Sequence, residues 1–93
     1  MQIAVLNEAQ LGEARVALMP ESIRKLAALK TTVLVESGAG NEAGVADTDY
    51  LEAGAKIAQE RAALLKPADI LISVNRPPAE DIIHLKRGAI ILK

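Results

Sequence analysis

Residues 68–74 read ADILISV, a run in which five of the seven residues are hydrophobic. Its isoleucines and valine favour an extended conformation, and its length is that of an ordinary strand. Pro67 ends the helical pattern before the run, and the pair Pro77–Pro78 turns the chain into another helical pattern after it. The run is therefore predicted to be a strand that lies between two helices.

The same alternation of short strand-like runs and longer helical patterns continues along the rest of the chain. Such an alternation is typical of βαβ units around a mostly parallel sheet. It predicts an α/β, Rossmann-like (flavodoxin-like) three-layer domain with a mostly parallel sheet, incomplete at the C-terminus because no helical pattern follows the last strand. The expected strands are residues 2–6, 31–36, 55–58, 68–74 and 89–92, and the expected helices are residues 20–29, 47–53, 59–65 and 79–85.

The composition limits the chain to one small domain with an aliphatic core. Hydrophobic residues make up 51% of the 93 residues, but there is no Trp or Phe and a single Tyr, so Ala, Val, Ile and Leu must fill the interior. Eleven Lys and Arg are scattered among twelve Asp and Glu, which argues against a nucleic-acid partner. The lack of cysteine excludes disulfides and thiolate metal sites. No metal site is predicted, and no apolar run reaches the ~20 residues of a membrane helix.

The loop at residues 7–19, NEAQLGEARVALM, follows the first predicted strand. Open α/β sheets bind ligands beyond the carboxyl ends of their strands, so this loop stands where a ligand would lie. Arg15 is its one strong anion-binding group, because a guanidinium can hold a carboxylate or phosphate through two hydrogen bonds. On chemistry alone, a surface arginine paired with Glu8 or Glu13 is the more common arrangement.

Several short motifs together give the chain a family resemblance. Glu8, the segment Gly12-Glu13-x-Arg15-Val16-Ala17 and the pair Pro20-Glu21 resemble the N-terminal signature of the alanine dehydrogenase / NAD(P) transhydrogenase α-subunit family. The segment Val74-Asn75-Arg76-Pro77 looks more like the transhydrogenase branch, since alanine dehydrogenases more often have Lys-Glu before the proline. The resemblance spans essentially the whole chain, continuing through VESGAG at 35–40, AGA at 53–55, ADI at 68–70 and LKRGA at 85–89.

This resemblance implies that residues 1–93 form an N-terminal, substrate-side domain whose NAD-binding domain is absent from this chain. It implies a cytoplasmic homo-oligomer that works with a nucleotide-binding domain or with the β-subunit of a transhydrogenase. In transhydrogenases the α-subunit exchanges hydride between NAD(H) and the NADP(H) on the β-subunit, and membrane segments elsewhere couple this exchange to proton translocation. The parent protein would be an oxidoreductase, whereas the 93-residue chain alone is expected neither to be active nor to bind NAD tightly.

One departure from the family pattern bears on the substrate. In alanine dehydrogenases that resemble this chain, pyruvate is held by the arginine matching Arg15 and by a lysine in a later strand, and Ser73 stands where that lysine is expected. A serine hydroxyl donates a hydrogen bond but supplies no cation, which disfavours an alanine dehydrogenase and affects a transhydrogenase less. Arg15, Ser73 and Asn75 are therefore the candidate substrate-binding residues, with no catalytic residue assigned. An alanine dehydrogenase-like fragment and a non-catalytic folded remnant are the alternatives.

Two further departures concern local stability. Met19 replaces the Ser or Thr that usually precedes Pro20 in the family, which removes a helix N-cap worth about 1 kcal/mol. Lys30 stands near where a helix-ending glycine is expected, and a non-glycine residue in a left-handed conformation costs roughly 1 kcal/mol. Both changes are expected to weaken the domain and to leave its chemistry unchanged.

Two other segments superficially suggest function. Gly38, Gly40 and Gly44 follow a strand, but their spacing is not that of a G-x-G-x-x-G loop opening directly into a helix, so a tight turn is predicted. His84, with Asp81 one turn earlier, is predicted to be a partly exposed helix residue and not a base. A receiver-type signalling module is a different class with a similar pattern, and the chain lacks the paired acids that a receiver needs after its first strand.

Overall fold

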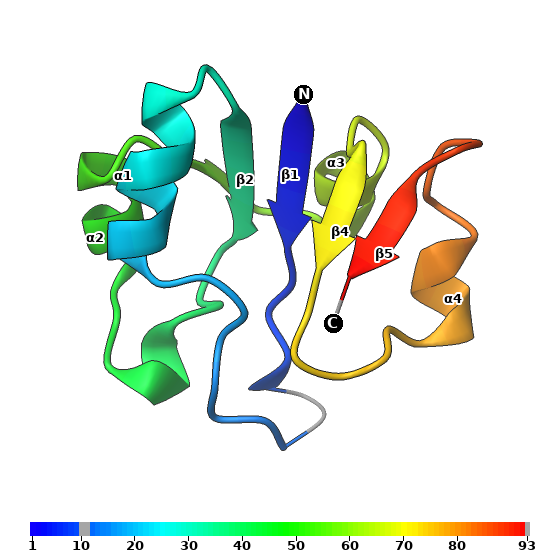
Figure 1. The fold of residues 1–93 in the computed structure, drawn as a ribbon. Helices are drawn as coiled ribbons and strands as arrows, with labels where there is room; N and C mark the ends of the chain where they lie inside the picture. Colours follow the sequence, from blue (N-terminus) through cyan, green and yellow to red (C-terminus); the bar gives the residue numbers. More distant parts are fainter. Residues whose placement is uncertain (10–11, 93) are drawn as a thin grey trace.

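A five-stranded sheet organises the part of the chain that the structure describes, residues 1–9 and 12–92. In this computed structural model all the strand pairs are parallel, and the strands lie in the order β3-β2-β1-β4-β5 (Figure 1). This order is that of a Rossmann sheet, and it confirms the predicted α/β class. The strands are β1 (Gln2–Val5), β2 (Thr32–Glu36), β3 (Lys56–Ala58), β4 (Ile70–Ile72) and β5 (Ile90–Leu92).

Helices lie on both faces of this sheet, as the prediction of three layers requires. Figure 1 shows α1 and α2 on one face and α3 on the other. Every predicted helix and strand is present, with shifted ends: the helix expected at 59–65 begins at Arg61, and the one expected at 79–85 ends at Ile82. The helices are α1 (Pro20–Ala28), the short 3-10 helix η2 (Asn41–Ala43), α2 (Asp47–Glu52), α3 (Arg61–Leu65) and α4 (Ala79–Ile82).

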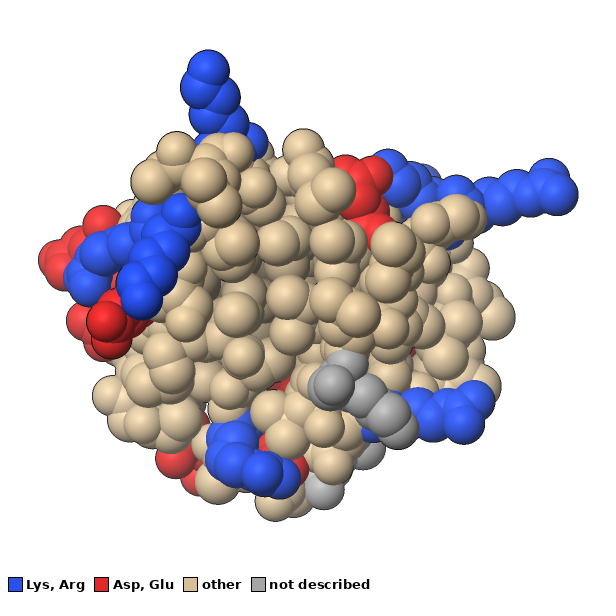
Figure 2. Space-filling model, viewed as in Figure 1, with Lys and Arg blue, Asp and Glu red and all other residues tan. Residues whose placement is uncertain are grey.

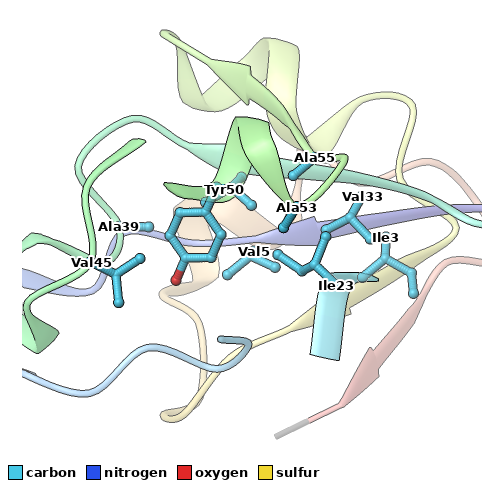
Figure 3. Close-up of a cluster of buried hydrophobic side chains, with 10 residues drawn as sticks. Ile3, Val5, Ile23, Val33, Ala39, Val45, Tyr50, Ala53 and Ala55 are labelled. Atoms are coloured by element: carbon cyan, nitrogen blue, oxygen red, sulfur yellow. The ribbon is translucent and has the colours of Figure 1, made fainter. Parts of the chain in front are cut away.

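The alternation of side chains along β1 divides the core in two, because successive residues of a strand point to opposite faces. Ile3 and Val5 belong to the cluster under α1 and α2, which Figure 3 shows with Tyr50 of α2. Ala4, and Leu6 just beyond the strand, belong to a second cluster on the α3 side. Apart from Tyr50, both clusters consist of Ala, Val, Ile and Leu, as the composition predicted.

Tyr50, the single aromatic residue, anchors the long loop between β1 and α1. Its side chain is fully buried, and its hydroxyl donates a hydrogen bond of 2.8 Å to the carbonyl of Leu18. Burial, and to a smaller degree the charge of Asp47, raises the pKa of Tyr50 to about 12. The end of the loop that carries Arg15 is therefore fixed to α2 through the core.

Both predicted local weaknesses are present. Met19 is the N-cap residue of α1 and makes no side-chain capping hydrogen bond, while Pro20 occupies the first turn of the helix. Lys30, just after α1, has a φ of 61°, which is the left-handed conformation predicted for it. Each of these positions lacks the residue type that the local backbone geometry favours.

Charged side chains are unevenly distributed over the surface, and the two halves of the sheet differ in how well their apolar side chains are covered. On the face seen in Figure 2, charged side chains lie around the periphery and uncharged residues fill the middle. The β1–β2–β3 half is covered by α1 and α2, whereas Ile90, Ile91 and Leu92 of β5 are between 37% and 54% exposed. The edge strand β5 thus contributes less apolar burial than the strands near β1.

Candidate functional site

The carboxyl ends of β1 and β4, which are neighbours in the sheet, bring two loops together at the lower edge of the molecule in Figure 1. Glu8 lies just beyond β1 and is buried. Its carboxylate accepts hydrogen bonds from the backbone N–H groups of Val74, at 2.8 Å, and of Asn75, at 2.9 Å. The segment that follows β4 is therefore attached to the loop that follows β1.

Asn75 extends this connection to Glu13. Its side-chain Nδ2 donates to Glu13 Oε1 at 2.8 Å and lies 3.4 Å from Glu8 Oε1. The Asn75 amide group is thus directed at two carboxylates of the β1–α1 loop. The structure places this predicted site residue behind Glu13, whose carboxylate it contacts.

Arg15 lies on the outer side of the same cluster. Its Nε and Nη2 donate to the two carboxylate oxygens of Glu13 at 3.0 and 3.1 Å, and its backbone N–H donates to Glu13 Oε2 at 3.0 Å. The Arg15 side chain is 75% exposed, whereas that of Glu13 is only 13% exposed. Of the two partners that the sequence allowed for Arg15, Glu13 is the one that pairs with it, because the Glu8 carboxylate is occupied by the amides after β4.

A hollow of about 530 Å³ opens beside this pair, and both Arg15 and Ser73 line it. Ser73 is buried, and its hydroxyl donates to the backbone carbonyl of Asn75. The remaining wall is apolar and includes Ala17, Met19 and Ile72. Arg15 is the cation among the residues that line the hollow, so an anion entering it would meet one guanidinium and one already bonded hydroxyl.

The charges in this cluster reinforce one another. The side-chain hydrogen bonds from Arg15, followed by its backbone N–H and by Asn75, lower the pKa of Glu13 to about 2. The Glu13 carboxylate in turn raises the pKa of Arg15. Both groups are therefore ionised at neutral pH.

Among the described residues, no group of three or more acidic or histidine side chains could hold a metal ion.

A second arginine cluster, absent from the sequence-based predictions, lies at the same edge of the sheet. Arg61, the first residue of α3, donates from Nε and Nη2 to Glu36 at 3.1 and 2.8 Å and from Nη1 to Asp81 at 2.8 Å. Its Nη2 also donates to the carbonyl of Asn7 at 2.8 Å, while Glu36 accepts the Asn7 N–H at 2.7 Å. These contacts raise the pKa of Arg61, chiefly through Glu36.

One signal in the sequence could have identified this cluster. Arg61 lies in the first turn both of the helix expected at 59–65 and of α3, and a cation there is unfavourable next to the positive end of the helix dipole unless carboxylates compensate it. Glu36 at the end of β2 and Asp81 in α4 supply them. The sequence alone relates Asp81 only to His84. The side chain of His84 is exposed, as predicted, but the residue lies in the turn after α4 and not in the helix.

The glycine-containing segment after β2 is the turn that its spacing predicted. The backbone N–H of Gly38 donates to Asp47 Oδ1, and the hydroxyl of Ser37 donates to Asp47 Oδ2, each at 2.8 Å. A Cβ on Gly40 would lie 2.8 Å from the Cβ of Val45, so a side chain cannot be added there without a shift. The Asp47 carboxylate therefore already accepts the Gly38 amide, which leaves this amide unavailable to a phosphate.

A protein-family model matches almost the whole chain. The model of the alanine dehydrogenase/PNT N-terminal domain matches residues 4–93. The chain belongs to this family. The motifs around Arg15 and along the remaining strands therefore indicated the correct family.

Relatives from both branches of the family are similar to the chain. The NAD(P) transhydrogenase subunit alpha of Cereibacter sphaeroides is 37% identical over 99% of this chain and 18% of its own length. The alanine dehydrogenase of Halomonas elongata is 38% identical over 95% of this chain and 24% of its own length. The crystal structure of a transhydrogenase from Sinorhizobium meliloti superposes with a TM-score of 0.89 at 36% identity, covering 98% of this chain and 27% of that one.

These comparisons establish the family and leave the branch open. The chain spans a quarter or less of the length of the curated relatives it matches. Nearly equal identity to a transhydrogenase and to an alanine dehydrogenase does not distinguish their activities. No helix in residues 1–9 and 12–92 is long and apolar enough to cross a membrane.

Proposed function

We propose that the chain is the N-terminal, substrate-side part of a proton-translocating NAD(P) transhydrogenase α-subunit, and that it contributes to hydride transfer between NAD(H) and NADP(H). The observation that carries this proposal is that Ser73, and not a lysine, lines the hollow at the carboxyl edge together with Arg15. A keto acid needs a cation for its carboxylate and a donor for its carbonyl oxygen. Here the charge of the Arg15 guanidinium is compensated by Glu13, and the hydroxyl of Ser73 already donates a hydrogen bond to the backbone carbonyl of Asn75.

A transhydrogenase makes smaller demands on this hollow. Its hydride passes between two nucleotides, so this domain needs only to form one wall of the interdomain cleft and to contact an anionic group there. Arg15 is the residue proposed for that contact, because its guanidinium is exposed at the cleft side of the sheet. Ser73 and Asn75 line or support the same position.

The nucleotides are assigned to other parts of the parent protein. Since the glycine spacing after β2 is not that of a dinucleotide loop and the Gly38 amide already donates to Asp47, NAD(H) is proposed to bind to a separate nucleotide-binding domain, which would supply the hydride chemistry. NADP(H) would be held by a partner β-subunit, and the domain would work as part of a homo-oligomer on the cytosolic face of the membrane. This chain's own residues would bind an anion, exclude water from one side of the cleft and orient the facing domain.

Alanine dehydrogenase is the second candidate, and the Halomonas elongata relative supports it. In that case Arg15 would bind the carboxylate of pyruvate, and another group would have to replace the missing lysine. Arg76 is the nearest cation in the sequence, but it lines a different hollow with Pro77, Ile82 and Ile91. The placement of Arg76 therefore favours the transhydrogenase.

The proposal is tested by expressing the chain together with the polypeptides encoded beside it and measuring two reactions. We expect hydride transfer from NADPH to an NAD analogue, and no reduction of NAD that depends on L-alanine. Alanine-dependent reduction would overturn the proposal in favour of the second candidate. The absence of both reactions from a folded, correctly assembled complex would favour a non-catalytic remnant.

The 93-residue chain alone provides a second test. A titration with NAD and NADH should show no tight binding, since the Gly38 amide after β2 already donates to Asp47 and NAD(H) is assigned to a separate domain. An Arg15→Ala variant of the assembled protein should bind its nucleotide or substrate anion more weakly. Tight binding of NADH to the isolated chain would mean that the cofactor site has been misplaced.

A further inference from the structure

The arrangement of donors around Arg15 shows how this side chain is kept ready for a ligand. A guanidinium has two bidentate edges, one formed by Nε and Nη2 and one formed by Nη1 and Nη2. Glu13 occupies the first edge, with distances of 3.0 and 3.1 Å. Arg15 Nη1 donates to none of the described residues and the side chain is 75% exposed, so the outer edge of the guanidinium can donate hydrogen bonds to an anion.

Glu13 is itself held in place from behind. Asn75 Nδ2 donates to its Oε1 at 2.8 Å, and the backbone N–H of Arg15 donates to its Oε2 at 3.0 Å. Asn75 is fixed in turn by its backbone N–H, which donates to the buried carboxylate of Glu8 at 2.9 Å. A continuous series of hydrogen bonds therefore connects an exposed guanidinium to the ends of β1 and β4.

The same arrangement has an electrostatic cost for ligand binding. Glu8, Glu13 and Arg15 place one positive charge against two negative charges around the site where an anion would bind. Glu13 therefore orients the guanidinium and at the same time reduces its attraction for an anion. A carboxylate whose only effect was competition would not need a second donor from another loop to hold it.

We propose that Glu13 is a positioning residue, which holds the inner edge of Arg15 and presents its outer edge to a small oxyanion, with Asn75 and Glu8 as the support behind it. The inference rests on the proposed use of Arg15 as an anion-binding group in the cleft. It adds a role for Glu13 and Asn75, and it predicts that orientation and charge at this site can be separated by substitution.

The first experiment needs no ligand. In the 15N-labelled 93-residue chain, the exchange of the Arg15 Hε proton with water should be slow relative to that of other exposed arginines. Glu13→Ala should accelerate this exchange at least tenfold, and Glu13→Gln, which keeps one oxygen for the guanidinium, should accelerate it less. Glu21→Gln removes an equal charge from the start of α1 and serves as the control. Equal exchange in the wild type and Glu13→Ala would overturn the proposal.

The second experiment uses pyruvate and inorganic phosphate as separate probes of the outer edge of Arg15. Glu13→Gln should bind the preferred probe at least as tightly as the wild type, because a competing charge is removed. Glu13→Ala should bind it at least threefold more weakly than Glu13→Gln, because orientation is lost as well. Equal or tighter binding by Glu13→Ala would mean that Glu13 only competes, and would overturn the proposal.

The two proposals fail in different ways. If neither probe perturbs Arg15 in the wild type, the anion site is wrong, and the role given to Glu13 is overturned with it. If the probes bind as expected but the assembled protein transfers no hydride between NADPH and the NAD analogue, only the proposed function is overturned. The positioning role of Glu13 would then stand, serving a different anionic ligand.

Discussion

Two arginines at the same edge of the sheet are used in opposite ways. Arg61 donates to Glu36, Asp81 and the carbonyl of Asn7, and its side chain is 27% exposed. Arg15 gives one edge to Glu13, and its side chain is 75% exposed. The comparison shows that the number of partners, and not the residue type, determines whether an arginine holds the fold together or is available to a ligand.

The largest expected effect separates the two arginines by stability. Arg61→Ala would leave Glu36 and Asp81, which are largely buried, without a cation, and we expect it to lower the free energy of unfolding by about 3 kcal/mol. Arg15→Ala should cause no comparable loss, since an exposed ion pair contributes little. Urea denaturation of both variants measures the difference. Equal urea midpoints would show that the Arg61 cluster does not stabilise the fold.

The next effect concerns ligand binding. Ser73→Lys would add a second cation to the hollow beside Arg15, and a charge-assisted hydrogen bond of roughly 1.5–3 kcal/mol should increase the affinity for pyruvate about tenfold or more. Ser73→Met has a similar length without the charge and is the matched control. Calorimetric titration with pyruvate measures the affinity of the two variants. The same affinity in both would mean that Ser73 is not positioned to contact an anion.

A smaller effect is expected where the Arg15 loop is attached to the core. Tyr50→Phe would leave the carbonyl of Leu18 without its donor and should cost about 1 kcal/mol in the free energy of unfolding. Since the folded-state pKa of Tyr50 is raised to about 12, its contribution is complete below pH ~10, the pKa of an unfolded tyrosine, and is lost as the pH rises through 12. Between pH 8 and pH 11.5 the free energy of unfolding of the wild type should therefore fall relative to that of Tyr50→Phe. An unchanged difference between the two proteins at the two pH values would contradict this assignment.

The smallest effect is in titration behaviour. The pKa of Glu13 is lowered to about 2, so the contribution of the Arg15–Glu13 pair is complete above the ordinary pKa of a glutamate and is lost as the pH falls towards 2. Arg15→Ala should raise the midpoint of Glu13 towards 4.5, its ordinary value, because the side-chain hydrogen bond from Arg15 is the largest cause of the shift. Carbon-detected NMR titration of the Glu13 carboxyl measures this. An unchanged midpoint would show that Asn75 alone holds the carboxylate.

The positions of the helices and strands could be predicted from the sequence, because hydrophobic periodicity and helix-breaking residues act locally. The run ADILISV contains β4, and the left-handed conformation of Lys30 followed from the place where α1 must end. The position of the loop that carries Arg15 followed from the rule that open α/β sheets bind ligands beyond the carboxyl ends of their strands, whereas Ser73 and Asn75 were named from the family resemblance. The family signature added the expectation that this edge carries the function.

The pairing of charges could not be read in the same way. Glu8 and Glu13 were equivalent candidates for Arg15, and the choice depends on amides of Val74 and Asn75 that lie more than sixty residues further along the chain. The Arg61 cluster likewise joins residues 20, 25 and 54 positions apart. Such contacts depend on which strands become neighbours in the sheet, and the local propensities of the residues do not determine the strand order.

By itself the sequence determined an α/β domain with an aliphatic core, the order of its strands and helices along the chain, the two poorly capped ends of α1 and the place of the loop that carries Arg15. Only the tertiary structure decided that Glu8 is a buried support, that Glu13 holds Arg15 and that Arg61 is a structural cation. The reason is physical: hydrophobic periodicity acts over one or two turns of chain, whereas a charge is satisfied by whatever groups the folded sheet brings within about 3 Å of it.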